Sequence, residues 1–457
     1  MTIRSSLFAQ MVRLGVSLAA LALLAMPAAA KGSGMKIQEV TSPGGIKAWL
    51  VESHANPLIA MRFAFRGGAS QDEPGKEGLA YFVTAMMDEG AGDLDSTAFQ
   101  EREQALAMRM DFDAGRDVML GSLQTLTENK DQVFDLLRLA MGQPRFDEDA
   151  LERVRAQILA GLKFDENDPE TVASLAWDKL AFHNHPYGRP VKGTTQSVSA
   201  ITTDDLHGYV RRVFARDKLV VSVVGDIDAE ELGKALDKIF GDLPAKSELS
   251  AVADANPTQG PKREVIVMDV PQSVAQFGLR GVSRHDTDFI PAYVLNYIIG
   301  GGGFSSRLME EVREKRGLAY SVYSNLYPYQ HGAVFIGNVA TKNEAVGQSL
   351  AVIQDELKRL AEHGPSEEEL ESAKAYLTGA YALRFESSTS IASQLLWIQI
   401  EDLGIDYVSR RNELVEAVTM DDVKRVARRM LAPDRLLTTI VGKPVEPAAT
   451  ARQGAPG

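Results

Sequence analysis

Residues 202–206 read Thr-Thr-Asp-Asp-Leu, and residues 419–423 read Thr-Met-Asp-Asp-Val, 217 positions further along the chain. Shorter segments recur at nearly the same offset: 217–219 with 434–436, 223–225 with 440–442, 63–67 with 277–281, and 151–152 with 370–371. The last two pairs have offsets of 214 and 219, so the spacing drifts by only a few residues. Chance explains one such pair but not an ordered run of them. The sequence therefore predicts a tandem duplication.

Each repeat combines β-rich segments with amphipathic helical segments. The period-2 and period-3.6 patterns predict strands at 59–66, 118–125, 219–224, 265–269, 275–279, 333–340 and 436–441. They predict helices at 97–107, 130–141, 148–164, 344–362 and 366–384. We therefore expect an α+β fold of two tandem homologous α+β domains, each a mainly antiparallel sheet with packed helices.

The first 30 residues are typical of a secretory signal peptide. The N-terminal segment contains Arg4 and Arg13 and no acidic residue. An apolar stretch follows at 14–26, and the small residues Pro-Ala-Ala-Ala end at Ala30. The apolar stretch is too short to span a bilayer, which needs about 20 residues. We expect cleavage near Ala30 and a chain that is periplasmic or otherwise exported, with no membrane contact afterwards; the alternative is an uncleaved membrane anchor.

The remaining boundaries follow from composition. Residues 245–263 are rich in Pro, Gly, Asn and Ser and predict a linker. This places an N-terminal domain at 36–244, a C-terminal domain at 264–445 and a flexible tail at 446–457.

Charge and cysteine content exclude several classes of protein. Without the two signal-peptide arginines, 49 − 2 = 47 basic residues face 62 acidic ones, a net charge of −15. Nucleic acid binding needs a basic face, so we expect no nucleic acid partner. The chain has no cysteine, which excludes disulfides and thiol chemistry.

Three segments carry a resemblance to a known family. They are Arg66 to Ala80 (Arg-Gly-Gly-Ala-Ser-Gln-Asp-Glu-Pro-Gly-Lys-Glu-Gly-Leu-Ala), His185-Pro186-Tyr187-Gly188, and Gly300 to Tyr320. In this order they resemble the pitrilysin-like (inverzincin) zinc metallopeptidases, over nearly the whole chain after the signal peptide. The chain is most similar to the processing-peptidase branch. The resemblance implies that two such domains form half of a four-domain peptidase chamber.

The resemblance also exposes a missing metal site. Active members carry His-x-x-Glu-His on a helix after Gly-Leu-Ala, which places two zinc-binding imidazoles one turn apart with a glutamate beside them as general base. Here Tyr81, Thr84 and Ala85 stand at those positions, and Gly161 stands where the resemblance implies a third ligand, a glutamate. These residues cannot assemble a tetrahedral zinc site. We expect this chain to bind no cofactor and to be inactive alone.

Two other patterns resemble binding sites only loosely. His183-Asn184-His185 and the aspartates 111, 113 and 117 lack the spacing of a zinc or calcium site, so we expect no metal. Gly300 to Gly303 is not followed by the Gly-Lys-Ser/Thr of a phosphate loop. By resemblance, Gly301, Gly302, Gly303 and Phe304 form a substrate-binding hinge at the chamber wall, between helices expected at 293–299 and 306–316; the alternative is a plain turn.

The resemblance assigns a catalytic pair, Arg313 and Tyr320, across the chamber from the zinc. A phenol O–H can donate to a developing oxyanion, and a guanidinium can grip a carbonyl or carboxylate. Arg316 is a nearby alternative for the second role. Without the resemblance, Arg313 reads as a solvated helix arginine and Tyr320 as an aromatic residue at a strand edge.

The expected function is therefore that of the non-zinc subunit of a heterodimeric zinc metallopeptidase. A homologous partner would supply His-x-x-Glu-His and zinc, and peptides or unfolded proteins would be the substrate. Two alternatives stay open: an inert scaffold descended from a peptidase, and a subunit that binds peptides without cutting them.

Overall fold

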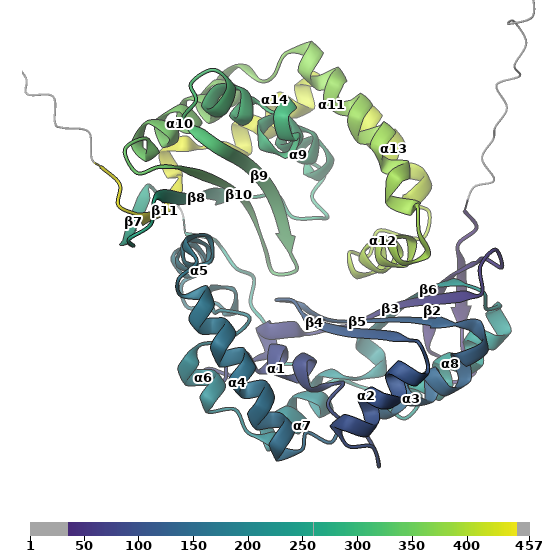
Figure 1. The fold of residues 1–457 in the computed structure, drawn as a ribbon. Helices are drawn as coiled ribbons and strands as arrows, with labels where there is room; N and C mark the ends of the chain where they lie inside the picture. Colours follow the sequence, from purple (N-terminus) through teal and green to yellow (C-terminus); the bar gives the residue numbers. More distant parts are fainter. Residues whose placement is uncertain (1–34, 259, 446–457) are drawn as a thin grey trace, which may run out of the picture. The chain divides into compact units, whose positions relative to one another are not determined.

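The computed structural model describes residues 35–258 and 260–445, in which the strands form two sheets (Figure 1). The predicted signal peptide and the predicted tail at 446–457 lie outside the described residues. The first sheet has the order β1-β2-β6-β3-β5-β4 and the second β7-β11-β8-β10-β9. The strands are β1 Gln38–Thr41, β2 Lys47–Glu52, β3 Leu58–Arg66, β4 Arg109–Ala114, β5 Val118–Leu126, β6 Leu219–Gly225, β7 Lys262–Val267, β8 Gln272–Arg280, β9 Ala319–Tyr329, β10 Gly332–Lys342 and β11 Leu437–Gly442.

The two sheets repeat one topology. If β1 is set aside, β2-β6-β3-β5-β4 corresponds strand by strand to β7-β11-β8-β10-β9. The pairs β2–β6 and β7–β11 are parallel, and every other pairing is antiparallel. The predicted α+β class, with two tandem homologous domains and mainly antiparallel sheets, is confirmed.

The α-helices lie mainly between the strands of each half. They are α1 Leu79–Met86, α2 Ser96–Ala105, α3 Lys130–Gly142, α4 Glu148–Asp165, α5 Pro169–Ala181, α6 Thr195–Ser199, α7 Thr203–Val213, α8 Ala229–Phe240, α9 Phe289–Asn296, α10 Val346–His363, α11 Glu367–Gly379, α12 Ser388–Ile400, α13 Tyr407–Glu416 and α14 Met420–Met430. The helix expected at 366–384 is shorter than predicted, because a 3₁₀ helix, Ala380–Phe385, replaces its end. The strand expected at 265–269 lies earlier, as β7.

The same short segments that reveal the duplication begin α7 and α14. Thr202 accepts a hydrogen bond from the N–H of Asp205, whose carboxylate accepts one in return from the N–H of Thr202. Thr419 and Asp422 form the same capping box before α14. Each box satisfies helix N–H groups that have no partner within the helix, which explains why both halves carry this pattern.

Each sheet packs on both faces, as the alternation of side chains along its central strands shows. Phe63 and Phe65 of β3 lie in the large core formed with helices of the first half. Ala64, between them, points to the other face and contacts α12 through Leu396 and Ile400. Side chains alternate across a strand, so β3 is buried on both sides.

Two helices pack on the sheet of the opposite half. Helix α5, from the first half of the sequence, contacts β8 and β11, and helix α12, from the second half, contacts β3 and β6. Trp177 of α5 is fully buried there and donates its indole N–H to the carbonyl of Leu437 at 3.3 Å. Gln399 of α12 donates to the hydroxyl of Ser222 at 2.7 Å. This reciprocal exchange ties the two halves together.

No helix within the described residues is both long enough and apolar enough to cross a membrane.

Candidate functional site

The positions of the expected zinc ligands lie on two helices that contact each other, α1 and α4. Tyr81 is half-buried, and the buried Thr84 donates its hydroxyl to the backbone carbonyl of Tyr81 at 2.7 Å. Ala85 packs against the first core. Gly161 is exposed, and a Cβ atom added there would meet nothing within 4 Å. The structure therefore brings together the two helices that carry the four predicted positions.

Helix α1 is fixed at its start by Asp72, a residue of the first family-like segment. Its carboxylate accepts the N–H groups of Gly78 and Ala80 at 2.9 and 3.0 Å. Burial raises the pKa of Asp72 to about 7, although these two N–H groups oppose the rise. These two hydrogen bonds fix the start of the helix that carries Tyr81, Thr84 and Ala85.

The side chains at these positions do not fit zinc. Zinc in proteins takes imidazole nitrogen, thiolate sulfur or carboxylate oxygen. Ala85 and Gly161 have no side-chain donor atom, and the Thr84 hydroxyl is engaged with the backbone. Within residues 35–258 and 260–445, no group of three or more His, Asp or Glu side chains could hold a metal ion.

An ion pair that the sequence did not suggest lies near Tyr81. The Lys192 ammonium binds the Asp165 carboxylate at 2.8 Å, and this hydrogen bond raises the pKa of Lys192. Asp165 is the last residue of α4, four positions after Gly161. No spacing rule links residues 165 and 192, so only the fold reveals the pair.

The glycine run in the second half is mostly helical, whereas the alternative to the expected hinge was a plain turn. A π-helix, Tyr297–Gly301, continues from α9, and a 3₁₀ turn, Gly303–Ser305, follows it. The N–H of Gly302 donates to the carbonyl of Tyr297 at 2.8 Å, the five-residue step that closes a π turn. A second π-helix, Met309–Glu314, stands within the helix expected at 306–316.

The predicted catalytic pair lies in direct contact. The Arg313 guanidinium lies 5.1 Å from the ring centroid of Tyr320 and 4.8 Å from that of Phe304. Between Arg313 and Tyr320, Gly317 adopts a left-handed φ of 61°, which turns the chain from the π-helix into β9. Tyr320 and Phe304 are 76% and 70% exposed, so both rings present most of their surface to solvent.

The alternative residue, Arg316, is engaged elsewhere. It donates to the Glu311 carboxylate at 2.6 Å, and Lys315 donates to the same carboxylate at 2.6 Å. Burial by itself would raise the pKa of Glu311, but these two hydrogen bonds outweigh it and hold the pKa below its usual range. The closest acid to Arg313 is Glu314, at 3.5 Å. Arg313 is therefore the better placed of the two arginines to bind a ligand.

The histidine loop has a structural role. His185 contacts the carbonyl of Ala253 at 2.8 Å, and its other ring nitrogen accepts the N–H of Tyr187. The buried Tyr187 donates its hydroxyl to Asp117 at 2.7 Å. These contacts explain the His-Pro-Tyr-Gly segment and the third aspartate of the calcium-like pattern without a metal.

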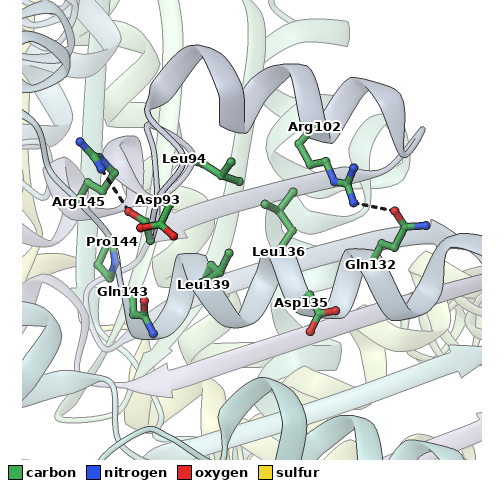
Figure 2. A pocket seen from close by; sticks show the side chains of 11 residues that line it. Asp93, Leu94, Arg102, Gln132, Asp135, Leu136, Leu139, Gln143, Pro144 and Arg145 are labelled. Carbon is green, nitrogen blue, oxygen red and sulfur yellow. Dashed lines mark hydrogen bonds between the residues drawn. The ribbon is translucent and has the colours of Figure 1, made fainter.

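A surface pocket of about 730 Å³ lies between α2 and α3 (Figure 2). None of the predicted site residues lines it. Its polar groups bind one another or close neighbours: Arg102 donates to Gln132 at 2.7 Å, and Arg145 binds Asp147 at 2.6 Å. Leu136 and Leu139 supply its apolar wall. It is a groove separate from the candidate site.

The fold and the site together define a peptidase-like chain of two tandem α+β domains without zinc ligands. The sequence matches the family "Insulinase (Peptidase family M16)" over residues 48–195 and "Peptidase M16 inactive domain" over residues 200–377. The chain belongs to the M16 peptidase family and is a zinc-ligand-deficient member of it. The predicted resemblance to pitrilysin-like peptidases is thereby confirmed.

Named relatives and solved structures agree with this assignment. The chain is 31% identical over 343 residues to the "Non-peptidase homolog YmxG" of Helicobacter pylori, which covers 74% of this chain and 78% of that protein. It is 25% identical to the "Uncharacterized zinc protease YmxG" of Bacillus subtilis, over 88% of this chain and 98% of that one. A crystal structure of a peptidase M16 inactive domain from Pseudomonas fluorescens superposes with a TM-score of 0.84 at 29% identity, covering 90% of this chain and 98% of that one.

Proposed function

We propose that this chain is the zinc-free subunit of an exported, heterodimeric zinc metallopeptidase. A homologous partner supplies His-x-x-Glu-His and the metal, and this chain supplies Arg313 and Tyr320 in trans. Peptides or unfolded proteins are the substrate, and the signal peptide predicted at residues 1–30 directs the chain to the periplasm. The observation that carries the proposal is the exposed stack of Arg313 between Phe304 and Tyr320.

The stack suits a role in substrate binding. Contacts with two aromatic rings restrict the position of the guanidinium and leave its N–H groups able to donate to a carbonyl or carboxylate. The Tyr320 hydroxyl is a neutral donor of the kind that stabilises a developing oxyanion. An aromatic side chain that is 76% exposed gains little from packing in this chain alone. A substrate or partner that covers it explains its position better than stability does.

The glycine segment supports the same role. Gly301, Gly302 and Gly303 lead directly into Phe304, one of the two aromatic walls of the stack. A Cβ atom at Gly302 would lie 2.8 Å from the Tyr297 carbonyl, and Gly303 has a left-handed φ of 58°, so side chains at these positions would disturb the segment. We propose that the segment lets a peptide backbone approach Arg313.

The test mixes the purified chain with a zinc-bearing M16 homologue that carries His-x-x-Glu-His and follows cleavage of a fluorogenic peptide. We expect the mixture to cleave and this chain alone to be inactive. Removing one oxyanion donor lowers turnover about 10²- to 10³-fold, so Tyr320→Phe should reduce turnover of the mixture strongly. Arg313→Lys keeps the charge but loses the planar stack and should raise KM.

Tyr376→Phe is the matched control, because Tyr376 is also exposed (58%) and lies on α11 outside the stack. It should leave turnover unchanged. Equal turnover with Tyr320→Phe would refute the catalytic role. A mixture that never cleaves, while the isolated chain retains peptides, would favour the peptide-binding alternative; a chain that does neither would favour the inert scaffold.

A further inference from the structure

A second pocket, of about 280 Å³, lies in the second half against α9, α12 and α13. Helix α9 follows β8 as α1 follows β3, so it is the counterpart of the helix that carries the lost zinc positions. Three arginines line the pocket, Arg284, Arg384 and Arg411, with a single acid, Glu401. Three positive charges and one negative give a local charge of +2, in a chain with a net charge of −13.

The arginines donate to neutral oxygens. Arg411 is only 5% exposed and donates to the Leu377 carbonyl at 2.6 Å and to the Tyr293 hydroxyl at 3.3 Å. Arg284 donates to the Tyr407 hydroxyl at 2.9 Å. Across residues 35–258 and 260–445, no carboxylate lies within 4.0 Å of the three guanidiniums. Arg411 is the buried one of the three, and burying a guanidinium without an anion is costly, so its charge is available to an anionic ligand.

Aromatic rings orient two of these guanidiniums. Arg411 lies 4.6 Å from the ring centroid of Tyr381, and Arg284 lies 4.3 Å from that of Phe289. Stacking on a ring face fixes the guanidinium plane and leaves edge N–H groups for a forked contact with a carboxylate. Trp397 adds an apolar wall that is 44% exposed. The pocket therefore offers oriented positive charge beside apolar surface.

Glu401 does not cancel this charge fully. Burial raises the pKa of its carboxyl group, which Arg284 and Arg66 oppose. Glu401 is one carboxylate beside three arginines, and Arg66 from outside the pocket also acts on it, so it does not neutralise all three. The volume of about 280 Å³ is at the lower limit of ligand pockets, which span roughly 300–1,000 Å³. It suits one or two residues of a peptide rather than a large ligand.

We propose that this pocket binds a peptide carboxylate through Arg284, Arg384 and Arg411, with a neighbouring apolar side chain against Trp397. The carboxylate can be the free C-terminus of a peptide or an acidic side chain, since both present the same pair of oxygens. The proposal does not rest on the proposed peptidase function, because the chain alone should bind.

The test measures fluorescence anisotropy of short labelled peptides with the full chain, without partner or zinc. One peptide ends in phenylalanine with a free carboxylate, the second is its C-terminal amide, and the third is that amide with an internal glutamate. We expect the first or the third to bind at least tenfold more tightly than the second, since a charge-assisted hydrogen bond contributes about 1.5–3 kcal/mol and 1.4 kcal/mol is tenfold. Whichever binds identifies the source of the carboxylate.

Substitutions of the lining arginines test whether the peptide binds in this pocket. Arg284→Gln and Arg384→Gln should each weaken binding about tenfold, and both positions are partly or fully solvent-accessible, so the fold should tolerate them. Arg410→Gln is the matched control, because Arg410 pairs with Asp406 at 2.7 Å and does not line the pocket. Equal affinity for all three peptides, or equal loss in the Arg410 variant, would overturn the proposal.

Discussion

Trp177 of α5 lies beside Gly278 of β8. Substitutions at these two positions test whether α5 packs on the sheet of the opposite half. A Cβ atom at position 278 would lie 2.4 Å from the Trp177 ring and 2.8 Å from the Phe335 carbonyl. Because real Cβ atoms do not approach so closely, Gly278→Ala must displace α5 from β8. Overpacking of this kind costs about 1–3 kcal/mol of the free energy of unfolding.

The second substitution of the double-mutant cycle removes the Trp177 ring. Trp177 is fully buried and donates to the Leu437 carbonyl. Truncation of a buried tryptophan to alanine costs about 3–5 kcal/mol, and Trp177→Leu, which keeps part of the volume, should cost somewhat less. In the Trp177→Leu background the clash with the ring is relieved and only the 2.8 Å approach to the Phe335 carbonyl remains, so Gly278→Ala should cost less there than in the wild-type chain. The coupling energy of the double mutant should be about 0.5–3 kcal/mol.

The assay is urea unfolding followed by circular dichroism, with all four proteins of the cycle. Gly347→Ala, in α10, is the control, because a Cβ atom there meets nothing within 4 Å. Its effect should be the same in the wild-type chain and in the Trp177→Leu variant. An equal loss in the free energy of unfolding on Gly278→Ala in that variant and in the wild-type chain would refute the packing of α5 on β8.

Two further predictions concern single positions. Gly161→Ala should raise the free energy of unfolding by about 0.5–1 kcal/mol in urea titrations, because position 161 is an open site within α4 and alanine favours a helix. A loss of stability would mean that Gly161 has a contact beyond the chain.

The second prediction concerns Asp422. The hydrogen bond from the Thr419 hydroxyl, with others from Thr419 and Arg425, lowers the pKa of Asp422 to about 2 from 3.8. A lowered folded-state pKa stabilises the fold above pH 3.8 and loses that effect as the pH falls to about 2. Asp422→Asn should thus cost about 1 kcal/mol at neutral pH, and its deficit against wild type should shrink in unfolding titrations between about pH 4 and 2; a deficit independent of pH would contradict the capping role.

The sequence revealed the parts of the fold that local chemistry determines. The Thr-x-x-Asp capping boxes at 202–205 and 419–422 recur because each begins an equivalent helix, and the duplication follows from them. The exchange of α5 and α12 was not predictable in this way. It depends on Trp177 and Gly278, which come from different halves and carry no shared spacing or period.

For the candidate site, too, the sequence predicted only the features that depend on residues close together in the chain. Arg313 and Tyr320 are close in sequence, so a family-like motif could identify them before their contact was known. The π-helix at 297–301 could not be predicted, because glycines disfavour helices and only packing holds them in one. Arg284 and Arg411 are far apart in the chain and meet only because α9, α12 and α13 converge.

The duplication gives this chain two copies of the same fold. The polar side chains that could bind a ligand differ between the two copies. On α1 and α4, two of the four expected ligand positions, Ala85 and Gly161, have no side-chain donor atom for a metal. The second half instead keeps Arg313 beside an exposed tyrosine, and Arg411 buried among neutral acceptors. A buried guanidinium without an anion lowers stability, and an exposed tyrosine adds little to it. Stability alone therefore does not account for Arg313 and Arg411, and the ligands proposed above would supply carbonyl or carboxylate oxygens to both arginines.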